Sequence, residues 1–286
     1  MTDFCHITPT RYLDMFATGR SFHLTLAHLV EIDKDYADFY KHLGQWSHMG
    51  QGSINIMDNS AFEMYKEGRP MYSTEKLIPM AHACGANYVV MSDYPDEDYK
   101  KTIDAAIEMA PDLIQAELGT FFVPQSKIGD VDGLIESFEW AAEESNIDYI
   151  GVSILAVPNA YGVEKHNKLQ RFLSRWKFMN TLSERGILDT IKENDKKLHF
   201  LGMVDGPNEI ELVRNYLWAI DTWDSSAAVW AGIMNTRFDN SPSGLINGKI
   251  ETPVDFDHNS ATIEQLGMAM SNCRYIDRLL EDKYED

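Results

Sequence analysis

The feature that most constrains this chain is an alternation of short β-rich runs with helix-length amphipathic segments. Strands are expected at residues 23–29, 54–59, 88–93, 121–125, 149–154, 198–203, 218–222 and 227–233. Helices are expected at residues 33–43, 74–84, 97–109, 132–144, 168–185 and 209–216. Strands that alternate with helices indicate βα units and a parallel sheet. Seven or eight such units predict an α/β fold of the (β/α)₈ TIM-barrel type.

The 286 residues suit a single barrel domain, since no linker or change of composition divides residues 1–286. Residues 235–259 are rich in Asn, Ser, Gly and Pro and predict a long loop, while residues 260–282 predict a C-terminal helix. The N-terminal residues lack a secretory pattern, and no apolar run has the length of a membrane span. A soluble, cytoplasmic protein is therefore expected.

The charge of the chain bears on its partners. A formal net charge of −20 argues against tight, non-specific binding to phosphate backbones. One basic run, residues 162–177, is the candidate for a local nucleic-acid contact. Its cations are Lys165, Lys168, Arg171, Arg175 and Lys177. The alternative is that this run forms an ordinary solvated face of a helix.

The cysteines and histidines indicate no metal centre. Cys5, Cys84 and Cys273 lie far apart and form neither a CxxC pair nor a cysteine–histidine cluster. They therefore predict neither a disulfide framework nor a zinc site, and they are expected in or near the core. Three histidines in or beside apolar runs are also expected to be core residues: His28, His82 and His199.

Several predicted strands end in a carboxylate or an amide. These residues are Asp58, Asp93, Gln125, and either Asp221 or Asp224. A charge at the end of an apolar run is costly to bury unless it is paired or used, and the carboxyl ends of barrel strands carry the reactive groups. One such Asp could cap a helix, but three at successive strand ends favour a shared site.

Two carboxylates on either side of a sugar C1′ can cleave and remake a glycosidic bond. One attacks C1′ and the other handles the proton of the leaving base. A further Asp can accept from the N1–H and the amine of a guanine-like base, while a Gln amide donates to its carbonyl. The pattern alone leaves other barrel chemistries open.

A family resemblance narrows these choices. The segment HFLGMVDGPNEIELVRNYLWAIDTWDSS resembles the part of tRNA-guanine transglycosylases in which a G-(V/I)-G-x-P turn precedes a helix and G-(I/V)-D-x-F-D-C. This implies that Asp224 is the covalent nucleophile. DNSAF resembles DSGGFQ, which implies that Asp58 is the general acid/base. SDYPDED resembles DECTPYP, VPQSK resembles VQGG, and GVSILAVPNA resembles GGLAVGE. Around the base we therefore expect Asn59, Phe62, Asp93, Gln125, Leu155, Ala156 and Met203.

The motifs follow the family order over roughly residues 54–237. The diglycine of the family is replaced by Ser60 and Ala61, VPQSK lacks the glycines of VQGG, and nothing resembles the zinc-binding subdomain. The chain is thus most similar to zinc-free, phage-type relatives that insert 7-deazaguanines into DNA. The resemblance implies a pentosyltransferase without cofactor or metal, which exchanges guanine in DNA for a 7-deazaguanine through a covalent aspartyl intermediate. The target nucleotide would be flipped or single-stranded.

Three other readings stay open at this point. The polymer could be tRNA, or the barrel could be a nucleoside hydrolase-type enzyme. In a different class, it could be a catalytically inactive, acidic binding protein that mimics nucleic acid. The sequence also leaves open whether the chain forms a homodimer.

Overall fold

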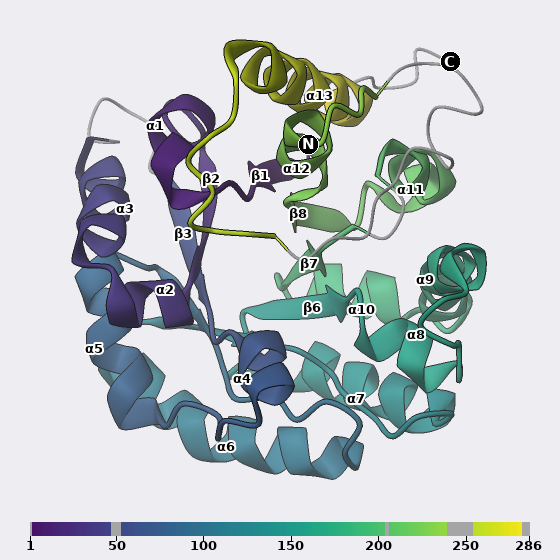
Figure 1. Cartoon of the computed structure of the whole chain (residues 1–286). Helices are drawn as coiled ribbons and strands as arrows, with labels where there is room; N and C mark the ends of the chain where they lie inside the picture. The colour runs from purple at the N-terminus through teal and green to yellow at the C-terminus, as the bar shows by residue number, and fades with distance from the viewer. Residues whose placement is uncertain (1, 47–52, 204–205, 239–253, 282–286) are drawn as a thin grey trace.

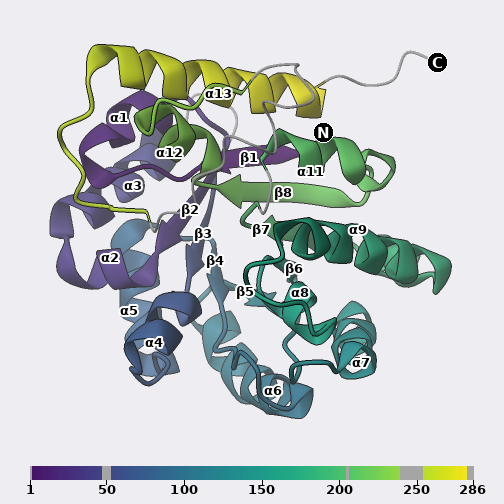
Figure 2. The ribbon, with the colours of Figure 1, turned by 45° about the vertical axis from the view of Figure 1, so that its right-hand side comes forward.

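The computed structural model describes residues 2–46, 53–203, 206–238 and 254–281. The described strands form one parallel sheet in the order β1-β8-β7-β6-β5-β4-β3-β2. Their bounds are β1 (Asp3–His6), β2 (Phe22–Leu26), β3 (Ile54–Asp58), β4 (Tyr88–Val90), β5 (Gly119–Phe122), β6 (Tyr149–Ser153), β7 (Lys197–Leu201) and β8 (Ile220–Ser225). The sheet curls into a nearly closed barrel with helices around it (Figures 1 and 2), which confirms the predicted (β/α)₈ class.

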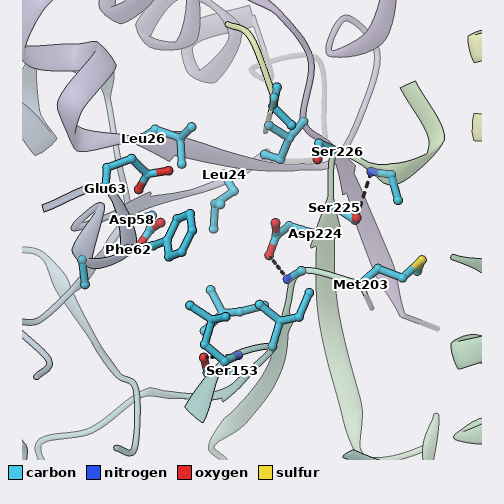
Figure 3. Close-up of a pocket in the computed structure, with 18 of the residues that line it drawn as sticks. Leu24, Leu26, Asp58, Phe62, Glu63, Ser153, Met203, Asp224, Ser225 and Ser226 are labelled. Carbon is cyan, nitrogen blue, oxygen red and sulfur yellow. Dashed lines mark hydrogen bonds between the residues drawn. The ribbon is translucent and has the colours of Figure 1, made fainter. Parts of the chain in front are cut away.

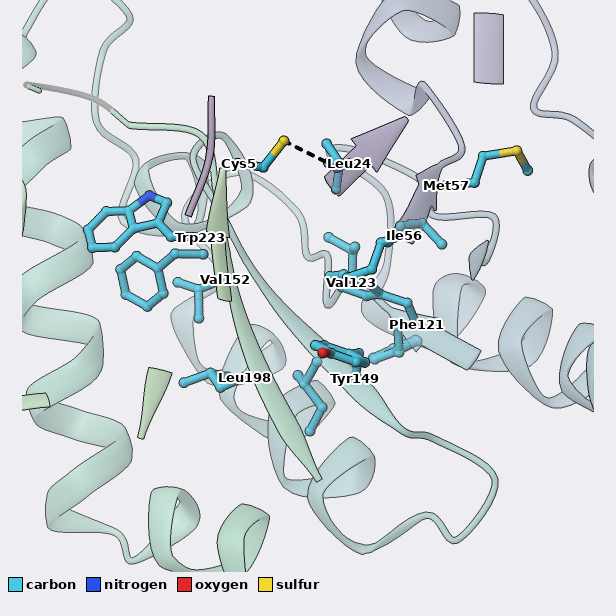
Figure 4. Packing of buried hydrophobic residues seen from close by; sticks show 14 of the residues in the cluster. Cys5, Leu24, Ile56, Met57, Phe121, Val123, Tyr149, Val152, Leu198 and Trp223 are labelled. Atoms are coloured by element: carbon cyan, nitrogen blue, oxygen red, sulfur yellow. Dashed lines mark hydrogen bonds between the residues drawn. The ribbon is translucent and has the colours of Figure 1, made fainter. Parts of the chain in front are cut away.

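The first and last strands of the sheet, β1 and β2, lie next to each other and are joined by a hydrogen bond between a backbone N–H and a side chain. Adjacent strands elsewhere pair in parallel, as in the register of Cys5 with Asp224 and of Leu26 with Asp58. Between β1 and β2, the backbone N–H of Leu24 donates to Cys5 Sγ over 3.2 Å (Figure 4). All eight strands therefore run the same way around one axis, and their carboxyl ends meet at one face.

Helices follow the strands and cover the outside of the barrel (Figure 1). They are α1 (Leu13–Phe16), α2 (Ala27–Ile32), α3 (Lys34–Trp46), α4 (Ala61–Glu67), α5 (Thr74–Cys84), α6 (Tyr99–Gln115), α7 (Val131–Glu143), α8 (Ala156–Ala160), α9 (Lys168–Glu184), α10 (Ile187–Glu193), α11 (Pro207–Leu212), α12 (Ala227–Ile233) and α13 (Ile263–Glu281). Helices α12 and α13 pack closely, since a Cβ on Gly232 would lie 2.3 Å from the Ala269 backbone.

The barrel interior is a packed core of aromatic and branched side chains. Phe121 and Tyr149 stack inside the barrel at 5.5 Å, whereas Trp223 and Phe200 pack at 4.7 Å on the outer face of the sheet, beside Arg175 of α9. Figure 4 shows Phe121 beside Tyr149 and Trp223 apart from them. His199 is part of this core and is fully buried. The cysteines Cys5, Cys84 and Cys273 are buried and free, as expected.

The structure corrects three details of the predicted elements. The predicted strand at 227–233 is wrong, because this segment is helix α12, whose buried residues Ala228, Val229, Gly232 and Ile233 follow helical spacing. The missing strand is β1, which is only four residues long and therefore gives little periodic signal. The predicted strand at 218–222 is shifted to Ile220–Ser225.

The C-terminal part agrees in outline with expectation. The helix predicted at 260–282 is α13, which begins at Ile263 and ends at Glu281. Of the predicted loop 235–259, residues 239–253 lie outside the described residues. None of the helices in the described ranges is long and apolar enough to cross a membrane.

Candidate active site

A cavity of about 700 Å³ opens at the carboxyl ends of the strands. Each strand, or the turn that directly follows it, contributes to the wall through Ile7, Leu26, Asp58, Asp93, Val123, Ser153, Leu201 and Asp224. In barrel enzymes this face carries the reactive groups. The cavity is therefore the candidate active site (Figure 3).

Nearly all of the residues expected at the site line this cavity. They are Asp58, Asn59, Phe62, Asp93, Gln125, Leu155, Met203 and Asp224. Ala156 is the exception, because it is buried at the start of α8 beneath the wall and not on it. Residues separated by more than half of the chain are thus brought together around one space.

Asp224, near the end of β8, is held from behind. Its side chain is almost buried, and Oδ1 accepts a hydrogen bond from the backbone N–H of Gly202 over 3.1 Å. The same oxygen lies 3.0 Å from Nε2 of His199. The other ring nitrogen of His199, Nδ1, lies 2.7 Å from the hydroxyl of Thr222. The carboxylate therefore has a fixed orientation at the cavity wall.

The prediction that His199 is a satisfied core residue is confirmed, but its contact with Asp224 was not foreseen. The signal for that contact lies in the pairing of the strands. His199 of β7 is the register partner of Thr222 of β8, and Asp224 follows two residues later on the same face. Without that register, the sequence does not place the two side chains together.

Asp221 does not belong to the cavity. It lies near the start of β8, where its carboxylate accepts from the backbone N–H of Leu198 over 2.7 Å and pairs with Lys192. These contacts anchor the amino end of the strand. Of the two aspartates in the WAIDTWD segment, only Asp224 faces the cavity.

Asp58 forms the opposite wall, at the end of β3. Burial raises the pKa of its carboxyl well above the ordinary value, and the negative charges of Glu63, Asp93 and Asp224 raise this pKa further. Glu63 lines the cavity beside it, and burial raises the pKa of that carboxyl too (Figure 3). Asp58 thus keeps a proton at a pH at which an exposed Asp has lost it, so it can act as a general acid.

Asp93 is the centre of a buried hydrogen-bond network. Asn59 Nδ2 donates to Asp93 Oδ1 over 2.7 Å, and Gln125 Nε2 donates to Asp93 Oδ2. Burial raises the pKa of Asp93 to about 6, against the lowering effect of these two donors. Asn59 is fixed in turn, since it also donates to the Met91 carbonyl over 2.6 Å. The network presents a carboxylate and amides at one wall of the cavity.

The turn after β3 contains a residue with a left-handed backbone conformation. Ser60 has φ +57°, in the left-handed region that a glycine adopts without cost. Its hydroxyl lies 2.8 Å from Nδ1 of His28 and accepts from the His28 backbone N–H over 3.1 Å. These contacts help to hold the strained residue in the turn that places Asp58 and Asn59.

The basic run gives a mixed result. Arg175 is fully buried and ion-paired with Glu209 at 2.8 Å, so the prediction that it contacts nucleic acid is wrong. Because of the helical period, the side chain at this position of α9 points toward the barrel, whereas the side chains next to it in sequence point in other directions. Lys165 is exposed, Arg171 lines the cavity, and the side chain of Lys168 lies outside the described residues.

Two further histidines were predicted to be buried. His28 is only partly buried and lines the cavity. His82 is exposed on α5, so the prediction of a core position for it is wrong.

In the described ranges, no three His, Cys, Asp or Glu side chains are grouped so that they could hold a metal ion.

Comparison of the sequence with models of known protein families and with curated proteins finds no match.

Proposed function

We propose that this protein is a base-exchange transglycosylase, which replaces guanine in DNA with a 7-deazaguanine through a covalent aspartyl–nucleotide intermediate. The observation that carries the proposal is that Asp58 and Asp224 line one cavity together with the Asp93–Gln125 pair. Two carboxylates around a sugar carbon and a polar wall for a base are the groups that this reaction needs.

In the first half of the reaction, a carboxylate oxygen of Asp224 attacks C1′ of the target deoxynucleotide. The bond between C1′ and N9 of guanine breaks, and its electron pair goes to N9. Asp58 gives its proton to the base, which leaves as neutral guanine. The raised pKa of Asp58 supports this role, because the acid must still hold its proton when the bond breaks.

The second half is the reverse reaction with a different base. A 7-deazaguanine enters, Asp58 takes the proton from its N9, and N9 attacks C1′. The bond between C1′ and Asp224 breaks, which regenerates the carboxylate. The same two side chains thus serve in both directions, as microscopic reversibility requires.

The polar wall supports recognition of a guanine edge. Ionised Asp93 can accept from N1–H and from the exocyclic amine, and Gln125 can donate to the ring carbonyl. Asn59 holds Asp93 in place. Phe62, half exposed at the rim, and Met203 would cover the two faces of the base. Since a base inside a duplex cannot reach such a cavity, the nucleotide must be flipped or single-stranded.

The test is a base-exchange assay with labelled 7-deazaguanine. Single-stranded DNA, duplex DNA and tRNA are each incubated with the protein, and we expect label to enter DNA. Asp224→Asn should abolish both incorporation and the covalent adduct, since an amide is a poor nucleophile. Asp221→Asn is the matched control, because it lies on the same strand but outside the cavity. It should retain incorporation.

The other outcomes contradict the proposal in different ways. Label that enters only tRNA would make the protein a tRNA-guanine transglycosylase. Release of free base without incorporation would indicate a nucleoside hydrolase-type enzyme. Failure to bind any base would favour an acidic binding protein without catalytic activity.

A further inference from the structure

We propose that His199 is a positioning residue, which orients Asp224 so that its Oδ2 oxygen is the one that attacks C1′. The inference rests on the proposed function, because it concerns the nucleophile of that reaction. It is carried by a row of contacts from Thr222 through His199 to Asp224 across strands β7 and β8.

The first step concerns the two oxygens of Asp224. Both contacts go to Oδ1, from the Gly202 N–H at 3.1 Å and from His199 Nε2 at 3.0 Å. They fix the plane of the carboxylate, and they stabilise the charge on Oδ1. Oδ2 is then the oxygen available to a sugar carbon in the cavity. Figure 3 shows the bond from Gly202 on one oxygen and the other turned away from it.

The second step concerns the proton on the imidazole. A bare Nε2 facing a carboxylate oxygen at 3.0 Å would be repulsive, so Nε2 must carry hydrogen to donate to Asp224. In the neutral ring, Nδ1 is then an acceptor, and the hydroxyl of Thr222 at 2.7 Å can donate to it. The Asp224 carboxylate thereby sets the tautomer, and the hydroxyl of Thr222 completes the pairing of the ring by donating to Nδ1.

The third step concerns the rigidity of the ring. His199 is fully buried, and its imidazole lies edge-on to Phe22 at 5.7 Å and to Phe121 at 5.4 Å. The ring is therefore held on two sides by packed aromatic groups and cannot turn without disturbing the core. A buried donor on a rigid strand is a stable reference for the direction of the nucleophile.

The test uses two amide variants with opposite predictions. The amide nitrogen of His199→Gln reaches the place of Nε2, whereas that of His199→Asn reaches only the place of Nδ1. Both remove the ring from the core, and Asn leaves one methylene more of empty space than Gln, a difference that the unfolding scan below measures. We expect His199→Asn to lower the rate of covalent intermediate formation by about 10- to 100-fold, which corresponds to one hydrogen bond to a charged group. His199→Gln should restore most of this loss.

Binding of free 7-deazaguanine should stay unchanged in both variants, because His199 is not among the residues that line the cavity. A second pair tests the hydrogen bond from Thr222 to Nδ1. Thr222→Val removes the hydroxyl and should slow the reaction, while Thr222→Ser keeps it and should not. A thermal unfolding scan of each variant separates slow but folded proteins from unfolded ones.

A spectroscopic readout keeps this inference separate from the proposed function. Nitrogen-15 NMR of the His199 ring should show hydrogen on Nε2 in the parent and a shift of the Nδ1 resonance in Thr222→Val, which loses the hydroxyl paired with Nδ1. If the parent exchanges no base, the proposed function fails, but the ring signal still tests the contact. If the parent is active and His199→Asn forms the adduct as fast as His199→Gln, or if Nε2 lacks hydrogen, the positioning role is wrong.

Discussion

Removing Arg175 should destabilise the protein more than any surface change. Arg175 lies in α9 with no exposed surface and pairs with the equally buried Glu209 at 2.8 Å. It also donates to the carbonyls of Gly202 and Val152 at 3.1 and 3.0 Å. Arg175→Met keeps the length of the side chain but leaves a buried carboxylate and two carbonyls without this donor.

The expected cost follows from that geometry. Breaking a buried ion pair by removing one partner costs about 3–5 kcal/mol, and each kcal/mol lowers Tm by roughly 2–4 °C in a domain near this size. We therefore expect Tm to fall by roughly 6–20 °C. Unfolding followed by circular dichroism, in urea and on heating, measures both quantities. Arg171→Met is the control, because Arg171 lies one helical turn away and is partly exposed.

A double variant tests the reason for the loss. Arg175→Met combined with Glu209→Met removes both charges, so the protein should recover much of its stability, since a buried ion pair can be replaced by apolar groups at little cost. If Arg175→Met unfolds within about 0.5 kcal/mol of Arg171→Met, the buried ion pair contributes nothing that a surface residue does not. Equal losses in the single and double variants would show that the loss does not come from separating Glu209 from Arg175.

Other predictions concern the site and the packing behind it. Binding of 7-deazaguanine should strengthen as pH rises through about 6 and then level off, because Asp93, whose pKa is raised to about 6, accepts hydrogen bonds from the base only when ionised. Calorimetric titration between about pH 5 and pH 8 checks this, and Asp93→Asn should remove the dependence. The same raised pKa predicts that the free energy of unfolding decreases as pH rises from about 4 to about 6, since the folded state holds this proton more tightly than the unfolded chain. Gly232→Ala should cost about 1–3 kcal/mol in a urea titration, because its Cβ would lie 2.3 Å from the Ala269 backbone, whereas Gly267→Ala, which meets nothing within 4 Å, should be neutral or stabilising.

Much of the fold could be predicted from local patterns. Seven of the strands are visible as apolar runs near their observed places, and their alternation with helices suffices for the barrel class. The errors fall where the pattern is short. Strand β1 has four residues, and the apolar run 227–233 fits a strand or a helix equally well. In the structure, β1 takes the position beside β8 in the sheet. The run 227–233 is therefore not a strand, and it forms helix α12 outside the sheet.

Some residues of the candidate site could likewise be predicted from the sequence, and others could not. Asp58 and Asp93 could be chosen from the sequence because each ends an apolar run, and a carboxylate in that position needs a reason. The same pattern offered both Asp221 and Asp224, and the structure shows that Asp224 is the one that lines the cavity. The roles of His199 and Arg175 could not be predicted from the sequence. Both read as ordinary residues in their own segments, one in a strand and the other in a basic run.

The sequence by itself determined most of the segments that become strands and helices, and which polar residues stand at the strand ends. This information is local, because side chains repeat at two residues in a strand and at about 3.6 in a helix. The tertiary structure decided which of those residues meet. The register of β7 on β8 placed His199 behind Asp224, and the packing of α9 on the barrel turned Arg175 inward to Glu209. Contacts of this kind depend on strands and helices far apart in the chain, so they exist only once the barrel has formed.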